Sequence, residues 1–156
     1  MQADSFDRFI GEHAFFRGLA ANHLATIVGC TSGVVFEQGD YLFREGEAAE
    51  RFFVLEYGRV AVETFIPTRG PITIETVEAG DVLGWSWLFP PYKWHFDARA
   101  QTLVRALALD GLSLRAKCQE EPALGFELMR RFSQVVVQRL EATQLQLLDL
   151  YGNSKP

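Results

Sequence analysis

Residues 37–42 read EQGDYL and residues 78–83 read EAGDVL, so the pattern E-x-G-D-x-L occurs twice, 41 positions apart. In both copies a glycine, which tolerates positive φ, and an aspartate, which favours turns, lead into residues typical of a strand. The chain therefore enters a strand twice through the same kind of turn. This repetition is typical of a jelly roll, where hairpins recur along the chain, and two copies are too few for a solenoid.

Short apolar runs separated by glycine-centred turns extend on both sides of this repeat, which is the pattern of an all-β roll. We therefore predict a mainly β fold, a double-stranded β-helix or jelly roll, over residues 33–115. The runs expected to form strands are Val34–Phe36, Tyr41–Phe43, Phe52–Leu55, Val60–Ile66, Ile72–Val77, Val82–Leu83 and Ala98–Leu109.

Helical patterns flank the predicted roll. Within residues 5–30, apolar residues recur every three to four positions, and Gly11 and Gly18 interrupt the run, which predicts short N-terminal helices. Within residues 116–151, Pro122 follows two glutamates and marks a helix start, and Gly152 marks its end. The helix from 122 to 151 would be about 45 Å long at 1.5 Å per residue. We expect residues 1–156 to form one domain.

An apolar seam runs along this C-terminal helix in steps of three or four residues. A compact roll is only about 25–30 Å across, so the second half of the helix should project with exposed leucines. We predict that the first half packs on the roll and that the helix forms a two-fold homodimer. The predicted interface residues are Met129, Phe132, Val136, Leu140, Thr143, Leu147 and Leu150.

Composition excludes several classes of function. The net charge is −5 and basic residues are scattered, which argues against a nucleic-acid binder. Two distant cysteines favour a reducing cytoplasm, and no apolar stretch is long enough to span a membrane. His95 is the single histidine of the β region, so we expect no metal and no cofactor. Phosphate-cradling glycine motifs are missing, and we expect no enzyme.

The order of elements resembles the sensor half of the catabolite-activator and fumarate-nitrate-reductase superfamily of bacterial regulators. The resemblance rests on Phe15–Leu19, the strand pair 36–46, the hairpin 53–60 and the glycine-bounded stretch 80–84. It implies a cyclic-nucleotide-binding jelly roll that acts in signal transduction. In full-length members a helix-turn-helix domain follows the long helix, whereas here the chain stops at Pro156. We therefore expect a stand-alone module that does not bind DNA directly.

The phosphate-binding motif of that superfamily is altered. In members that bind cyclic nucleotides, a glutamate directly after G-D-x-x-G accepts from the ribose, and an Arg-Ser or Arg-Thr pair further on grips the cyclic phosphate. Here Trp85 stands at the glutamate position, and Trp94 and His95 stand at the Arg-Ser positions. A buried anion needs a cation or several donors. The resemblance therefore implies that cyclic AMP and cyclic GMP are not bound in the usual way.

All three tryptophans lie in the substituted segment, where six of the twelve residues from 85 to 96 are aromatic. The indoles either fill the nucleotide cavity, or stack on a planar or cationic ligand, or anchor a protein partner. If the segment 94–99 is extended, His95, Asp97 and Arg99 share one face, as a ligand-facing row, a solvated edge or an internal salt-bridge set. The candidate ligand-binding residues are Gly84, Trp85, Ser86, Trp87, Lys93, Trp94, His95 and Arg99.

These observations favour a regulatory or sensory module with a degenerate phosphate-binding cassette, which senses an unidentified small molecule or acts through a protein partner. The first alternative is a structural or protein-interaction scaffold whose pocket is permanently closed. A cupin-like enzyme comes third, because such a site needs several histidines around one metal.

Overall fold

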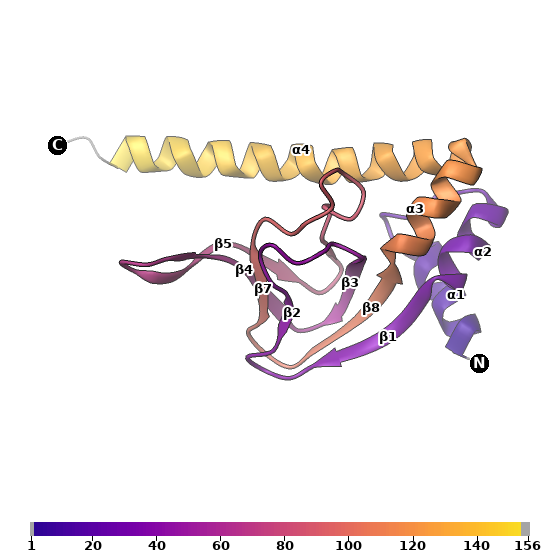
Figure 1. Ribbon diagram of the computed structural model, residues 1–156, viewed down its shortest axis with the longest axis horizontal. Helices are drawn as coiled ribbons and strands as arrows, with labels where there is room; N and C mark the ends of the chain where they lie inside the picture. Colours follow the sequence, from indigo (N-terminus) through magenta and orange to yellow (C-terminus); the bar gives the residue numbers. More distant parts are fainter. Residues whose placement is uncertain (1, 154–156) are drawn as a thin grey trace.

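Two four-stranded antiparallel sheets face each other and form the roll in Figure 1, in a computed structural model that describes residues 2–153. The first sheet has the order β1 (Thr31–Phe36), β8 (Val104–Asp110), β3 (Arg51–Tyr57) and β6 (Val82–Leu83). The second has the order β2 (Tyr41–Phe43), β7 (Asp97–Ala100), β4 (Arg59–Ile66) and β5 (Gly70–Glu78). The predicted mainly β jelly roll is confirmed.

The strand β3 is covered on both faces, which explains why four consecutive residues of it are buried. Phe53 points into the roll and meets Phe36 edge-on, with ring centroids 5.9 Å apart. Phe52 points the other way and contacts Phe132 of the long helix, with centroids 5.0 Å apart. An unbroken apolar run is the pattern expected of a strand buried on both sides.

The repeated E-x-G-D turn takes the same form in both places. The carboxylate of Asp40 accepts from the backbone N–H of Glu37 at 2.8 Å, and that of Asp81 accepts from Glu78 at 2.9 Å. The glycines of the two turns have φ of 93° and 94°. The prediction that one turn enters a strand twice is thus confirmed.

Four helices flank the roll within residues 2–153: α1 (Gln2–Glu12), α2 (Ala21–Gly29), α3 (Gly111–Glu120) and α4 (Pro122–Asn153). Figure 1 shows α4 crossing the roll and continuing beyond it, above the β4–β5 hairpin, which extends in the same direction. Leu124, Leu128 and Phe132 are fully buried, so the first half of α4 packs on its own roll. Over the same residues, no helix is long and apolar enough to cross a membrane.

Most predicted boundaries shift by a few residues, and two differences change the elements themselves. The run 98–109 is two strands, β7 and β8, because residues 101–103 bend away and bond to the start of β4: Gln101 N–H donates to Arg59 O at 2.9 Å. The last strand ends at Asp110, close to the predicted Leu109, but the roll ends there instead of at residue 115, because α3 follows at once. The side chain of Asp110 caps α3 by accepting from the backbone N–H of Ser113.

Gly58, between β3 and β4, packs closely against the segment between β7 and β8, and this contact requires a glycine. Its φ is 97°, and a Cβ there would lie 2.2 Å from the carbonyl oxygen of Leu103. Gly39 has a similar φ of 93° but nothing within 4 Å of its Cβ position. Substituting Gly39 therefore tests backbone strain alone, whereas substituting Gly58 tests backbone strain together with steric overlap.

We expect Gly39→Ala to cost about 1–2 kcal/mol, the ordinary penalty of a left-handed conformation for alanine. Gly58→Ala should cost clearly more, because backbone must move to admit the methyl group. Urea unfolding of both variants beside the native chain measures the difference. Equal stability of the two variants would contradict the close approach of the turns.

Candidate functional site

A cavity of about 340 Å³ lies between the second sheet, the segment 83–96 and α4. We call it the inner cavity. Its walls are mainly apolar and aromatic, which is typical of a site for a small organic molecule. The lining residues are Phe43, Val62, Ile74, Glu75, Leu83, Gly84, Trp85, Ser86, Trp94, His95, Phe96, Val136, Arg139, Leu140 and Thr143.

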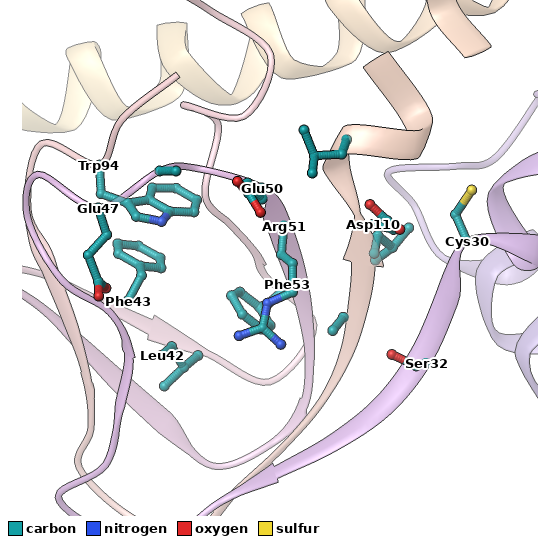
Figure 2. Close-up of a pocket in the computed structure, with 14 residues that line it drawn as sticks. Cys30, Ser32, Leu42, Phe43, Glu47, Glu50, Arg51, Phe53, Trp94 and Asp110 are labelled. Carbon is teal, nitrogen blue, oxygen red and sulfur yellow. The ribbon is translucent and has the colours of Figure 1, made fainter. Parts of the chain in front are cut away.

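A second hollow of about 610 Å³ opens on the other side of Phe43 and Trp94, which line both spaces. We call it the outer pocket. Figure 2 shows the Trp94 ring beside that of Phe43 at one end of this pocket, and Cys30 and Ser32 at the other. Burial raises the pKa of the Cys30 thiol, with the Asp110 carboxylate adding to the effect, so this cysteine is a poor nucleophile.

Trp94 stacks flat on Phe43 and divides the inner cavity from the outer pocket. The ring centroids are 3.7 Å apart, the interplanar angle is 10°, and Trp94 is only 6% exposed. The backbone of Trp94 is fixed on both sides: its N–H donates to Glu47 O at 3.0 Å, and its carbonyl accepts from Gly46 N–H at 2.9 Å. The stack on Phe43 and these backbone bonds together place the indole between the two spaces that it lines.

Gly84 makes room for that indole. Its φ is 96°, and a Cβ at this position would lie 2.8 Å from Cη2 of Trp94. A side chain on residue 84 would therefore push the Trp94 ring off Phe43. Gly84, which was predicted to bind a ligand, therefore provides the space in which the Trp94 ring packs.

Trp85 and His95 lie together at the cavity, with ring centroids 5.8 Å apart, and Phe89 meets Trp85 edge-on at 6.2 Å. Trp85 is half-buried and His95 is exposed. Ser86 is buried and also lines the cavity. Five of the eight candidate residues are therefore brought together: Gly84, Trp85, Ser86, Trp94 and His95.

The other three candidates lie elsewhere. Trp87 is fully buried in the core, stacked on Phe52 with centroids 5.0 Å apart and edge-on to Phe132 at 5.4 Å. Lys93 is exposed and pairs with Ala48 in a β-bridge. Neither Trp87, nor Lys93, nor Arg99 is among the lining residues of the inner cavity. The indole that looked like a cassette residue in the sequence is a core residue in the fold.

Arg99 is committed to an ion pair on the far face of β7. Its Nε and Nη2 donate to the two carboxylate oxygens of Glu63 at 3.0 and 2.8 Å, and Glu63 is only 3% exposed. The hydrogen bond to that carboxylate, followed by its charge, raises the pKa of Arg99. Ala98 and Ala100, which alternate with Arg99 along the strand, are the residues buried inside.

The row formed by His95, Asp97 and Arg99 is therefore mostly an internal salt-bridge set. Asp97 accepts from the backbone N–H of Glu45 at 2.8 Å and lies 3.5 Å from Arg44. Among the alternatives left open by the sequence, the internal salt-bridge set describes Asp97 and Arg99. His95 alone reaches the inner cavity.

Sequence reasoning missed two arginines: Arg139, which lines the inner cavity, and Arg115, which holds the segment around Trp87. Arg139 of α4 forms an ion pair with Glu75 of β5 and donates to Val82 O at 3.0 Å. Arg115 of α3 donates to Trp87 O at 2.6 Å, and its guanidinium lies 4.1 Å from the ring centroid of Tyr92. The sequence contains one signal that could have identified Arg139: it is a charged residue between Val136 and Leu140 of the apolar seam.

The predicted dimer residues divide into three groups. Phe132 is fully buried against its own roll, so the structure corrects its assignment to the interface. Val136, Leu140 and Thr143 line the inner cavity. Met129, Leu147 and Leu150 are 39%, 51% and 67% exposed, so their side chains are accessible to a partner.

Comparisons with known proteins agree with this architecture. Residues 33–121 match the family described as cyclic nucleotide-binding domain. A CRP-like cAMP-activated global transcriptional regulator of Mycobacterium tuberculosis is 25% identical over 96% of this chain and 65% of its own length. The chain thus spans about two thirds of that relative. Human cGMP-dependent protein kinase 2 is 30% identical over 52% of this chain and 11% of its own length.

Solved structures show the same roll. A protein of Geobacter metallireducens GS-15, proposed to bind cyclic nucleotides, has a TM-score of 0.77 at 29% identity and covers 87% of this chain and 98% of its own. The sensor domain of the transcriptional regulator DNR from Pseudomonas aeruginosa has a TM-score of 0.72 at 19% identity, over 90% and 94% of the two chains. The second likeness concerns the fold alone.

We expect Arg99→Gln to destabilise the chain by about 2–3 kcal/mol, because it leaves the buried Glu63 carboxylate without its cation. The figure is below that of a fully buried pair because the Arg99 side chain is 38% exposed. Arg69→Gln, at the exposed β4–β5 turn, is the matched control and should change stability little. Thermal unfolding measures both, and an Arg99→Gln variant as stable as the control would refute a structural role for the pair.

Proposed function

Because the chain belongs to the cyclic nucleotide-binding domain family, we propose that it is a regulatory module whose inner cavity senses a small molecule other than a cyclic nucleotide. The Mycobacterium tuberculosis relative is a cAMP-activated transcriptional regulator, and the human relative is a cGMP-dependent protein kinase. The chain shares the roll of this family, while its inner cavity is proposed to accept a different ligand.

The observation that carries this proposal is the Trp94–Phe43 stack. Trp94 stands where the resemblance places the phosphate-gripping arginine, and it is 6% exposed and held flat against Phe43. Trp85 stands where the resemblance places the ribose-binding glutamate. An indole offers a single N–H donor and no charge, so it does not replace a guanidinium at a cyclic phosphate.

The remaining cations near the cassette also fail to supply a phosphate site. Arg99 is bound to Glu63 on the opposite face of the sheet, and Lys93 is exposed and outside the cavity. Among the described residues that line the cavity, the basic side chains are Arg139, which is paired with Glu75, and His95, which is exposed. A cyclic phosphate would therefore meet a single guanidinium that Glu75 already occupies, and Trp85 offers no carboxylate to the ribose hydroxyl.

A permanently closed scaffold is the weaker alternative. The aromatic cassette leaves about 340 Å³ of space, which lies within the range of about 300–1,000 Å³ usual for small-molecule sites. A cavity of that size beside a long helix favours a ligand over a purely structural role.

The same helix supports a homodimer as the output of this module. Leu145, Leu147, Leu148 and Leu150 are each more than half exposed on the part of α4 that extends past the roll (Figure 1). An apolar surface of this kind usually marks an interface, and a self-complementary two-fold contact is its simplest form. Leu140 and Thr143, at the cavity, belong to the same predicted seam, so the ligand site and the interface share one helix.

Isothermal titration calorimetry with cyclic AMP and cyclic GMP tests the ligand proposal. We expect no binding at millimolar nucleotide, and no change in the emission of the three tryptophans, because the phosphate donors are missing. Titration of each cyclic nucleotide into buffer without protein, at the same concentrations, gives the heat of dilution as a control. Saturable binding below about 10 μM, that is about 7 kcal/mol of affinity, would overturn the proposal.

Light scattering at micromolar concentration tests the dimer. Leu147→Glu should shift the mass toward a monomer, because a charge in the seam has to be desolvated on association. Gln146→Glu, the adjacent exposed residue with the same added charge, is the control and should keep the dimer. A monomeric native chain, or a Leu147→Glu variant that dimerises like the control, would contradict the predicted interface.

A further inference from the structure

Resting on the proposed function, we infer that the ligand of the inner cavity is a small monocarboxylate with an apolar or aromatic body, whose carboxylate binds Arg139 in place of Glu75. The inference concerns the chemical class of ligand that the cavity accepts. It follows from the distribution of charge around the cavity and from the way Arg139 is held.

The cavity contains one strong cation in an apolar surrounding. Of the described residues that line it, Arg139 is the single arginine or lysine. The lining also includes the aromatic residues Phe43, Trp94 and Phe96 and the aliphatic residues Val62 and Leu83. Aromatic and aliphatic walls bind an apolar body, and one guanidinium binds one carboxylate through two parallel N–H···O bonds.

Arg139 keeps a fixed position when Glu75 leaves it. Its Nη2 donates to the backbone carbonyl of Val82 at 3.0 Å, independently of the ion pair that Nη1 makes with Glu75. A backbone acceptor does not move with the ligand. The guanidinium therefore stays at the cavity while its carboxylate partner is exchanged.

The exchange has a low cost because the ion pair is partly exposed. The side chains of Arg139 and Glu75 are 28% and 27% exposed, so the released Glu75 carboxylate can be hydrated. Because it is partly exposed, the Arg139–Glu75 ion pair also contributes little to the stability of the fold, so breaking it costs little. In contrast, the Glu63 carboxylate bound to Arg99 is 3% exposed and would be left buried by such an exchange.

The charge balance selects a ligand with one negative charge, because the lining offers no second lysine or arginine within the described residues. A cyclic phosphate also carries one charge, but its ribose would need the carboxylate that Trp85 replaces, whereas a carboxylate on an apolar body needs only the guanidinium and the apolar walls. A cationic ligand would have to displace the Arg139 guanidinium, which Val82 also holds. A neutral ligand would gain nothing from the charge.

Binding in this way would act on α4. The Arg139–Glu75 pair joins α4 to β5, and the Val82 contact joins α4 to β6. A ligand carboxylate removes the first contact and keeps the second. The ligand would thus bias how α4, with its predicted interface, is held on the roll.

Calorimetry with phenylacetate and hexanoate, each beside its amide, tests the inference on the full chain. We expect each acid that fits to bind at least ten-fold more tightly than its amide. Arg139→Gln should abolish this difference, whereas Arg130→Gln, on the exposed side of the same helix, should preserve it. Glu75→Gln should raise acid affinity several-fold, because it removes the competing carboxylate.

Acids and amides that bind equally, or acids that bind the Arg139→Gln variant like the native chain, would overturn the inference, as would failure of every acid to bind. The acid–amide comparison on the native chain needs no variant, so a misfolded Arg139→Gln chain, detected by circular dichroism, does not prevent a decision. Failure of this inference without cyclic-nucleotide binding leaves the proposed function standing. Tight cyclic-nucleotide binding would refute the proposed function instead.

Discussion

The packing of Trp94 on Phe43 is the contact on which the rest of the site depends. It requires a residue without a side chain at Gly84, because a Cβ there would overlap the indole. Two backbone hydrogen bonds also hold Trp94 to Gly46 and Glu47, in the loop between β2 and β3. Phe43 and Trp94 line both the inner cavity and the outer pocket, so the shape of both spaces depends on this single stack.

Two ion pairs near the site have different roles, one in stabilising the fold and one at the inner cavity. Arg99, which lies in the cassette by sequence, stabilises a nearly buried glutamate on the outer face of the sheet. Arg139, which lies in a helix predicted for dimerisation, is the strong cation of the cavity. The structural pair is buried on its acidic side, and the pair at the cavity is partly hydrated on both sides. That difference in burial separates a fixed ion pair from an exchangeable one.

The long helix connects the two halves of the proposed function. Its first half belongs to the core, through Phe132 and the residues it contacts, and its middle forms a wall of the inner cavity. Its last part carries exposed leucines beyond the roll. A single rigid element therefore contacts the core, the ligand space and the predicted partner, which is the arrangement needed for a ligand to influence association.

The sequence by itself determined the elements whose geometry is local. Glycine–aspartate turns, apolar runs and Pro122 set backbone conformation within a few residues, so the jelly roll, its repeated turn and the start of α4 were predictable. Only the tertiary structure decided that Trp94 lines the cavity, as Trp85 does, while Trp87 lies in the core. Trp87 and Trp94 are chemically alike, and their stacking partners Phe52 and Phe43 are about 35 and 51 residues distant along the chain. The pairing of Arg139 with Glu75 is equally non-local, because helix packing on the sheet, and no sequence pattern, brings the two side chains together.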